Sequence, residues 1–378
     1  MDPEEAAPLD HPVETTSQQA DWQFTARHRL DAFLARCRSR PESVRGVRSI
    51  TLRERNGNTG VMLGWFNDEE DDLLITPEDV EVFAGACSNL DRLQLDWDNF
   101  DFASENFTVP ALIPLASRLG SLSLGDYSPG RDAQVAFMQE YLPAAANTLQ
   151  TLSLRRSLFL TEPMWQSMTH HLQALVKLSI AFPEDLASWQ SEERDFGAPV
   201  TISASAWLAS DLHKLSSLRH LRLKYSGEWT PPDLQQVEVR HPAVTTLDVS
   251  PILMLSPRSL QERCLPQLKE LFLTARSTEI DFWEQHRVPH RSLVVRQHRL
   301  LKALMDTPGF GRLSRLSLRN RSVASVIDAG IVDGIFRAGT SLQELVLPGT
   351  TTLSTSSSGL QVETNSDGVS VRRSFMIR

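Results

Sequence analysis

A six-residue pattern with aliphatic residues at its first, fourth and sixth positions recurs along most of the chain and constrains the fold more than any other feature. The fourth and sixth residues are two apart, so they point to the same side of a short β-strand. One strand cannot bury such an apolar side, whereas strands stacked in sequence order share a core. The nine copies begin at Leu90, Leu119, Leu149, Leu175, Leu218, Val244, Leu268, Leu313 and Leu342, and a looser copy begins at Val47.

The spacing between copies is typical of leucine-rich repeats. Six of the spacings between first positions lie between 24 and 30 residues, which is room for one strand and one return segment. The three longer ones, of 43 to 45 residues, contain either an insertion or a degraded repeat. The sequence therefore predicts an α/β fold, an irregular leucine-rich-repeat solenoid with parallel strands on the concave face and helices and loops on the convex face.

Several return segments have apolar residues at helical spacing. One of them, residues 110–116, contains two prolines and is expected to be irregular. The others are expected to form helices at 133–142, 164–175, 203–215 and 295–305.

The ninth position of the repeat departs from the usual form. Leucine-rich repeats generally carry Asn or Cys there, and the side chain bonds the backbone at a tight turn. Without that ladder we expect stacking with irregular curvature. The position is occupied here by Asp98, Tyr127, Ser157, Pro183, Ser226, Ile252, Arg276, Arg321 and Thr350.

The chain is expected to divide into three parts. Residues 1–21 are acidic, polar and Pro-containing and are expected to be disordered. Residues 22–348 form the solenoid, which begins with a capping helix at 22–40 whose buried side contains Phe24, Leu30, Phe33 and Leu34. Residues 349–378 form a Ser/Thr-rich tail, in which Asp367-Gly368 between alternating runs indicates a terminal hairpin.

Composition excludes several classes. The chain has no apolar run long enough to span a membrane, and its acidic start is not a secretory signal. Three scattered cysteines favour a reducing compartment, so the expected location is cytoplasmic or nuclear. The net charge of −9 argues against a nucleic-acid partner, although residues 1–100 are markedly acidic and residues 201–378 are mildly basic.

No catalytic or metal-binding constellation is visible in the sequence. The phosphate-binding, dinucleotide-binding, hydrolase and zinc-protease motifs are absent. Pro289 breaks the helical spacing of His286 and His290, so surface histidines are the favoured interpretation there. His170 and His171 are adjacent and are expected to point apart. We therefore expect no cofactor, no metal and no enzymatic activity.

The concave face is the expected working surface, because the third, fifth and seventh residues of each copy project from it. Small polar residues leave room for a partner along a serine stripe made of Ser123, Ser153 and Ser179. Beside it lies a basic patch made of Arg155, Lys177, His220, Arg222 and Lys224. Our hypothesis is that this patch receives an acidic peptide; the alternative is a merely solvated face. Thr246, Asp248 and Phe272 project from the same face outside the predicted site.

The N-terminal part resembles a known family. The run from Arg29 to Leu34, then Arg40-Pro41 and the VRSITL sequence from Val47, together with the repeats, resembles F-box-associated leucine-rich-repeat proteins of filamentous fungi over roughly residues 25–348. In that family the repeats hold substrates for a cullin-type ubiquitin ligase while the F-box docks an adaptor. Residues 1–24 lack a Leu-Pro-x-Glu-Leu-Leu start and are too short and polar for a three-helix box, which argues against adaptor binding.

Three functions remain open at this point. The first is a non-catalytic protein-interaction module, with a protein or peptide partner and no membrane partner. The second is a ubiquitin-ligase substrate receptor whose N-terminal box is absent or lost. The third is a hydrolase hidden in a degenerate solenoid, which would need a pocket that joins a nucleophile to a histidine.

Overall fold

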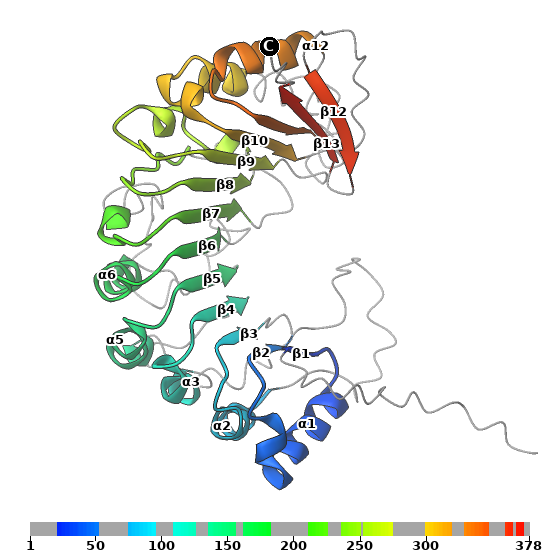
Figure 1. The fold of residues 1–378 in the computed structure, drawn as a ribbon. Coiled ribbons are helices and arrows are strands. Elements are labelled where there is room, and N and C mark those ends of the chain that lie inside the picture. The colour runs from blue at the N-terminus through cyan, green and yellow to red at the C-terminus, as the bar shows by residue number, and fades with distance from the viewer. Residues whose placement is uncertain are drawn as a thin grey trace, which may run out of the picture.

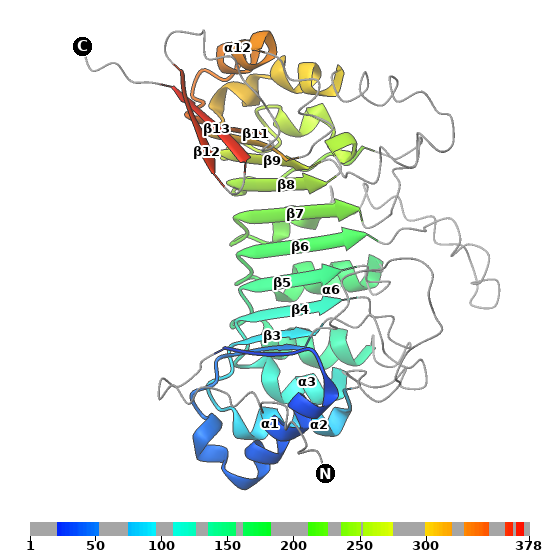
Figure 2. The same cartoon turned by 90° about the vertical axis from the view of Figure 1, so that its right-hand side faces the viewer.

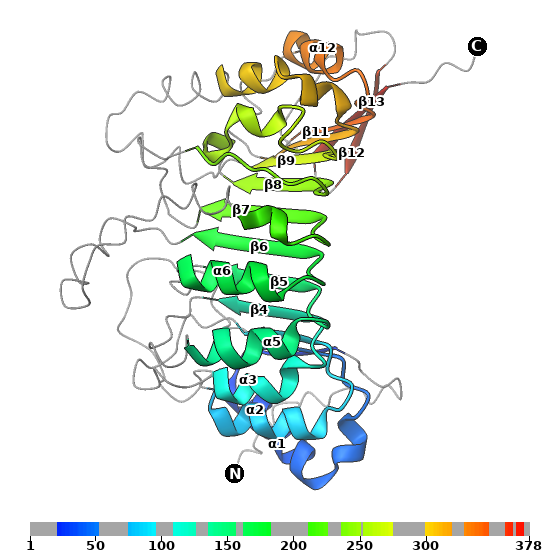
Figure 3. The same cartoon turned by 90° about the vertical axis from the view of Figure 1, so that its left-hand side faces the viewer.

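The protein is a curved stack of strands with helices along its outer side (Figure 1). Figure 2 looks onto the strands of the concave face, and Figure 3 looks onto the helices that cover the convex face. The expected α/β leucine-rich-repeat solenoid is thus confirmed. The computed structural model describes residues 21–52, 75–95, 109–125, 135–155, 162–182, 211–225, 236–250, 252–274, 299–319, 329–347, 360–365 and 368–373.

Eleven strands follow one another in the sheet in sequence order, and each neighbouring pair among them is parallel. Every copy of the pattern, including the loose one at Val47, supplies one of β2 to β11. The strands are β1 (Asp21–Phe24), β2 (Ser49–Leu52), β3 (Arg92–Leu95), β4 (Ser121–Gly125), β5 (Thr151–Arg155), β6 (Lys177–Phe182), β7 (His220–Tyr225), β8 (Thr246–Ser250), β9 (Glu270–Thr274), β10 (Arg315–Arg319) and β11 (Glu344–Leu347).

The core consists of two aliphatic rows that run the length of the sheet. The fourth residues of successive copies are direct register partners, as in the pairs Leu93–Leu122 and Leu178–Leu221. They are at most 1% exposed from Ile50 to Leu345. Burying one leucine side chain contributes roughly 1.5–3 kcal/mol to the free energy of folding. These leucines are buried only when the strands stack, so each repeat depends on its neighbours for most of its stability. The sixth residues form the second row.

A backbone ladder joins successive repeats at the N-terminal ends of the strands, whereas the ninth positions follow the strands and, except for Ile252, lie outside the described residues. The carbonyl just before each strand accepts two N–H groups from the next repeat, at 2.8–3.2 Å. Gly120, for example, accepts from the N–H groups of Gln150 and Thr151. The series is unbroken from Arg48 to Glu344. Hydrogen bonds between main-chain groups do not depend on side-chain identity, so the repeats stack without the usual Asn or Cys.

No further strand lies in the sheet between the strands that flank the three long spacings. Strands β2 and β3, β6 and β7, and β9 and β10 flank these spacings, and each pair is directly hydrogen-bonded in the sheet. A hidden repeat would have placed its own strand between them. The open alternative is therefore resolved in favour of insertion, at the level of the sheet.

The convex face changes character along the stack. Its first half is covered by longer helices and its second half mainly by 3-10 turns, with a helix at residues 299–305 and another near the C-terminus. The elements are α1 (Arg27–Ser39), η1 (Pro41–Val44), α2 (Pro77–Ala86), α3 (Val109–Ala116), η4 (Phe137–Tyr141, a π-helix), α5 (Leu142–Ala145), α6 (Glu162–His171), η6 (Leu212–Lys214), η7 (Ile252–Met254), η8 (Pro257–Leu260), η9 (Pro308–Arg312) and α12 (Ala329–Ala338).

Two expectations about these segments are wrong. The segment with two prolines is the helix α3, because its buried residues Leu112 and Leu115 pack into the core although Pro114 cannot donate a backbone hydrogen bond. Residue Phe24 belongs to strand β1 and not to the capping helix, which begins only at Arg27. The aromatic ring of Phe24 is nevertheless buried, 5.0 Å from that of Phe33.

The expected helix at 133–142 contains a π-turn. The N–H of Leu142 donates to the carbonyl of Phe137, five residues earlier. Pro143, which has no N–H to donate, follows directly in the first turn of the α-helix α5, where a missing donor is tolerated. Of the other expected helices, α6 ends at His171, and most of 203–215 and the residues before 299 lie outside the described part of the chain.

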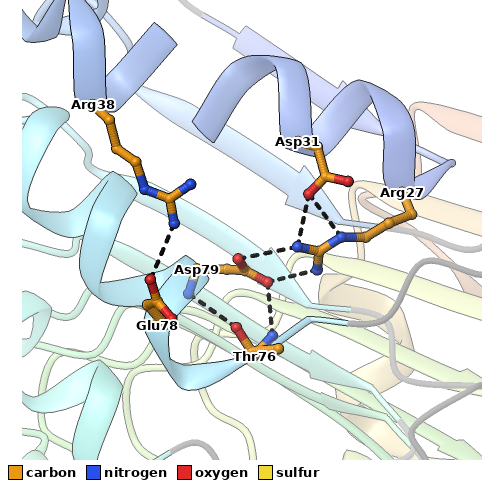
Figure 4. A network of polar contacts seen from close by, with 6 residues as sticks. All are labelled: Arg27, Asp31, Arg38, Thr76, Glu78 and Asp79. Atoms are coloured by element: carbon orange, nitrogen blue, oxygen red, sulfur yellow. Dashed lines mark hydrogen bonds and ion pairs between the residues drawn. The ribbon is translucent and has the colours of Figure 1, made fainter. Parts of the chain in front are cut away.

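The N-terminal end is closed by α1 and α2, which are joined by a partly buried ion pair (Figure 4). Nη1 of Arg27 lies 2.7 Å from Oδ2 of Asp79, whose side chain is only 3% exposed. Asp79 also completes the capping box of α2, accepting the N–H of Thr76 while its own N–H donates to the Thr76 hydroxyl. The Asp79 carboxylate is therefore stabilised both by the positive charge of Arg27 and by the N-terminus of α2.

The C-terminal end is closed by two antiparallel strands, β12 (Leu360–Asn365) and β13 (Gly368–Arg373), of which β13 pairs with β11. Glu344 of β11 accepts hydrogen bonds from the Ser370 hydroxyl and from Arg372 of β13, both at 3.0 Å. Burial alone would raise the pKa of Glu344. The hydrogen bonds from Arg372 and Ser370 and the nearby charge of Arg315 outweigh this and lower it.

Candidate functional site

The concave face is built by the residues that alternate with the buried leucines. In the middle row, the register runs from Gln94 through the serine stripe to Arg222, Asp248, Phe272 and Ser317. The three stripe residues, Ser123, Ser153 and Ser179, are therefore direct neighbours on β4, β5 and β6 and all are half-buried. The Oγ atom of Ser123 is buried and has no hydrogen-bond partner among the described residues.

The residues of the predicted basic patch lie on three consecutive strands. Lys177 of β6 and His220 of β7 are register partners, and both are exposed. Arg222 and Lys224 follow on β7 at alternate positions. Arg155 of β5 pairs with Ala181, which pairs in turn with Lys224. The backbone therefore brings the five positions together, although the side chain of Arg155 lies outside what the structure describes.

A pocket of about 180 Å³ lies within this patch. It spans β6 to β9, and three of its lining side chains, those of Lys177, His220 and Arg222, belong to the predicted site. The full lining consists of Lys177, Leu178, His220, Leu221, Arg222, Thr246, Asp248 and Phe272. We call this hollow the central pocket.

An acidic neighbour offsets part of the positive charge. Nε of Arg222 lies 3.0 Å from Oδ2 of Asp248, whose side chain is 16% exposed. The other carboxylate oxygen, Oδ1, is buried and has no hydrogen-bond partner among the described residues. The positive charge of Arg222 is therefore at least partly offset by Asp248. Neither Lys177 nor His220 makes a side-chain hydrogen bond or ion pair with another described residue.

The ring of Phe272 forms the wall of the pocket on its C-terminal side and is held by contacts with the next strands. The guanidinium carbon of Arg315 lies 5.3 Å from the centre of the Phe272 ring, a cation–π contact. Nε of Arg315 lies 2.9 Å from Oε2 of Glu344, which also binds β13. The wall is therefore tied to the closing strands of the solenoid.

Sequence reasoning missed three pocket residues, Thr246, Asp248 and Phe272. All three lie at outward positions of the repeat and were placed on the correct face. The signal that would have assigned them is the register itself, since the fifth residues of consecutive copies are neighbours and Arg222 is followed by Asp248 and Phe272. An opposite charge at the same position of the next repeat predicts an ion pair.

The expectation for the adjacent histidines His170 and His171 is wrong, and the other histidines singled out in the sequence are not described. The rings of His170 and His171 were expected to point apart, but they lie 4.8 Å apart in an edge-on contact. Adjacent residues of a helix diverge by only about 100°, so two broad rings at the end of α6 can touch. Burial and the neighbouring His170 lower the pKa of His171. His286, His290 and His298 lie outside the described residues.

No group of three or more His, Cys, Asp or Glu side chains in the described ranges is placed to hold a metal ion. Within the same part of the chain, every helix is too short or too polar to cross a bilayer.

No protein-family model matches the chain, and no curated protein sequence matches it. Among solved structures, it is similar to the leucine-rich repeat-containing protein LegL7 from Legionella pneumophila, with 13% sequence identity and a TM-score of 0.44, over 85% of this chain and 90% of that one. The description of the site therefore rests on this chain's own strands and register.

Proposed function

We propose that the chain is a non-catalytic protein-interaction module whose concave face binds an acidic segment of a protein partner at the central pocket. The observation that carries this proposal is the meeting of three donor side chains, Lys177, His220 and Arg222, from two neighbouring strands on one hollow. Lys177 and His220 are exposed and have no partner among the described side chains. A carboxylate of the partner would supply the missing acceptor.

The flanking surface supports the same proposal. The serine stripe presents short hydroxyl side chains on β4 to β6, next to the pocket. An extended segment can approach the sheet closely there and find hydrogen-bond donors and acceptors. Arg155 and Lys224 belong to the same proposed binding surface.

The test compares one charge reversal inside the pocket with the same reversal outside it. The probe is a fluorescein-labelled peptide rich in Glu, with a Gln-substituted peptide as its neutral counterpart, followed by fluorescence anisotropy. Lys177→Glu should weaken binding of the acidic peptide at least tenfold, about 1.4 kcal/mol, because it turns attraction into repulsion. The matched control is Lys302→Glu, an equally exposed lysine on the helix at 299–305, which should leave the affinity unchanged.

A stronger version replaces Arg155, Arg222 and Lys224 together by Glu, with folding checked by circular dichroism. If this variant and Lys177→Glu both bind the acidic peptide as well as the unaltered protein does, the proposed surface is not the binding site. Equal affinity for the Glu and Gln peptides would also contradict the role of charge.

A second candidate is substrate recognition for a cullin-type ubiquitin ligase. The order of helix α1, a turn at Arg40-Pro41 and strand β2 follows the arrangement in the family that the sequence resembles. The test is co-purification of the chain with the F-box adaptor after co-expression. Retention of the adaptor by the chain would favour this candidate, and its absence would leave the interaction module alone.

A further inference from the structure

The two ends of the central pocket differ in chemistry. At the end formed by β6 and β7, the lining side chains of Lys177, His220 and Arg222 carry N–H donors. At the end formed by β9, the lining side chain is the ring of Phe272. A ligand that offers only a carboxylate therefore uses one end of the hollow and leaves the aromatic end in water.

The charges of the lining fix the end at which an acidic group binds. Asp248 of β8 lines the pocket, and Glu270 of β9 accepts a hydrogen bond from the Thr246 hydroxyl at 3.2 Å. Both carboxylates lie on the β8 and β9 side, where they repel a second negative charge. Lys177 and His220 are register partners of each other on β6 and β7. An acidic side chain of the partner is therefore favoured at the β6–β7 end and disfavoured at the β9 end.

The ring of Phe272 is already held in place for a second contact. It is partly exposed, and the guanidinium carbon of Arg315 lies 5.3 Å from its centre. The positive charge of Arg315 is in turn engaged by Glu344, at 2.9 Å. Aromatic rings pack favourably against one another, and rigid aromatic anchors carry much of the affinity of protein interfaces. An aromatic side chain of the partner is the group that this end of the hollow fits best.

The sheet sets the spacing between the two contacts. Strands β6 to β9 are consecutive (Figure 2), so Phe272 lies two strand steps from His220 and three from Lys177, roughly 10–14 Å. In an extended peptide, side chains four residues apart lie on the same side, about 13 Å apart. The side chain midway between them would lie over the ion pair of Arg222 and Asp248, whose charges offset each other, so an uncharged residue suits that place.

We propose that the central pocket recognises a two-point motif in an extended segment of its partner. An acidic residue binds at the β6–β7 end, and an aromatic residue four positions away packs against Phe272. This inference rests on the proposed function and defines the partner more closely, because it makes the affinity depend on the position of an aromatic residue as well as on acidic charge.

The experiment compares two fluorescein-labelled peptides of identical composition by fluorescence anisotropy with the full-length protein. Each has two central glutamates, two phenylalanines and serine at every other position. In the spaced peptide, one phenylalanine stands four residues before the first glutamate and the other four residues after the second, which serves both chain directions. In the adjacent peptide, the phenylalanines flank the glutamates directly. The spaced peptide should bind about three- to tenfold more tightly.

Protein variants assign this difference to the two ends of the hollow. Phe272→Leu keeps an apolar side chain but removes the ring, so it should abolish the advantage of the spaced peptide and leave the affinity for the adjacent peptide unchanged. Lys177→Glu should weaken binding of both peptides. The matched control is Gln94→Ala, in the same outward row as Phe272 but on β3, which should change neither affinity.

The unaltered protein decides the proposal even if a variant folds poorly. Equal affinity for the spaced and adjacent peptides, with both bound more tightly than their glutamine counterparts, would overturn the two-point motif and leave the acidic-segment function standing. If the glutamate peptides bind no better than the glutamine ones, the proposed function fails and the motif with it. An equal loss of both peptides in Phe272→Leu would also overturn the motif, because the ring would then only maintain the pocket.

Discussion

Asp248 places a negative charge inside the proposed site. Its Oδ2 lies 3.0 Å from Nε of Arg222, while its Oδ1 is buried with no hydrogen-bond partner among the described residues. An acidic ligand that approaches Arg222 therefore has to compete with a carboxylate that is already in place. In the proposed role, Asp248 would favour strongly acidic ligands, because a weakly charged ligand gains little from a guanidinium that already has a carboxylate partner.

The first prediction concerns this competition. Asp248→Asn keeps the shape of the side chain and removes its charge, so Arg222 becomes available and the affinity for the acidic peptide should rise about two- to tenfold. The peptide-anisotropy titration measures it. Thr246→Ser, at a neighbouring pocket position, serves as a control without change of charge. A weaker affinity of the Asp248 variant would mean that the carboxylate itself contacts the ligand.

The second prediction concerns a buried hydroxyl. Tyr141 is fully buried and stacks on Phe137 at 4.8 Å between ring centres, and its hydroxyl has no hydrogen-bond partner among the described residues. Burial raises the pKa of this hydroxyl. Because an unsatisfied buried polar group costs about 1–3 kcal/mol, Tyr141→Phe should increase the free energy of unfolding by about 1 kcal/mol. Urea denaturation measures it; a loss of stability would reveal a partner for the hydroxyl.

At the scale of elements, two 3-10 turns in the second half of the convex face are packed closely against each other. The 3-10 turns η8 and η9 pack so tightly that a Cβ on Gly309 would collide with the backbone carbonyl of Leu260. No flexible side chain can move aside there. The position therefore requires glycine for reasons of space.

The third prediction uses two glycines as a matched pair. Gly309→Ala should lower the free energy of unfolding by about 1–3 kcal/mol, the usual cost of overpacking. A Cβ on Gly85 of α2 would meet nothing within 4 Å, so Gly85→Ala should raise the free energy of unfolding by about 0.5–1 kcal/mol. Urea denaturation of both variants checks the prediction. If both variants changed the free energy of unfolding by the same amount and in the same direction, the turns η8 and η9 would have to move apart to accommodate the added methyl group at position 309.

A buried histidine, His241, links the segment before β8 to the segment before β7. His241 is 1% exposed; its Nε2 lies 3.0 Å from the carbonyl oxygen of Leu215, and its Nδ1 accepts the N–H of Ala243. With Nδ1 as acceptor, Nε2 carries the proton. Burial lowers the pKa of His241, in spite of the bond to Leu215. The folded protein therefore holds this ring neutral.

The fourth prediction follows from that shift. Below the ordinary histidine pKa of about 6.5, the unfolded chain takes up a proton that the folded chain does not. Stability should therefore be complete above that pH and fall as the pH drops toward the lower folded value, by up to about 1.4 kcal/mol per pH unit. His241→Gln should reduce this dependence in urea denaturation between pH 7 and 5. An unchanged pH dependence would assign it to other groups.

At the scale of the whole molecule, the repeat pattern was sufficient to predict the ten parallel strands β2 to β11. Alternation alone placed Leu93, Leu122 and Leu152 at equivalent inward positions, because an apolar side must face the shared core. Strand β1 was missed, since it has Trp22 and Phe24 and lacks the rest of the motif. The convex elements were predicted less well, because prolines, π-turns and 3-10 turns are selected by packing against the core and not by periodicity.

The site was only partly predictable for a related reason. The outward positions follow from the same alternation, so Lys177, His220 and Arg222 were placed on the concave face. The 43-residue spacing before β7 left open whether Lys177 of β6 and His220 of β7 are neighbours, which the structure shows them to be. The Arg222–Asp248 pair spans an ordinary 26-residue spacing and could have been predicted from the repeat register alone.

The most direct test of this account is one distance across the 43-residue spacing before β7. Spin labels at Thr151 of β5 and Glu270 of β9, in a chain whose three cysteines are replaced by serine, are separated by four strand steps in the same row. At about 4.8 Å per step, double electron–electron resonance should give a distance near 19 Å. A distance of about 24 Å or more would mean that a further strand lies between them and that the repeats are not stacked as described.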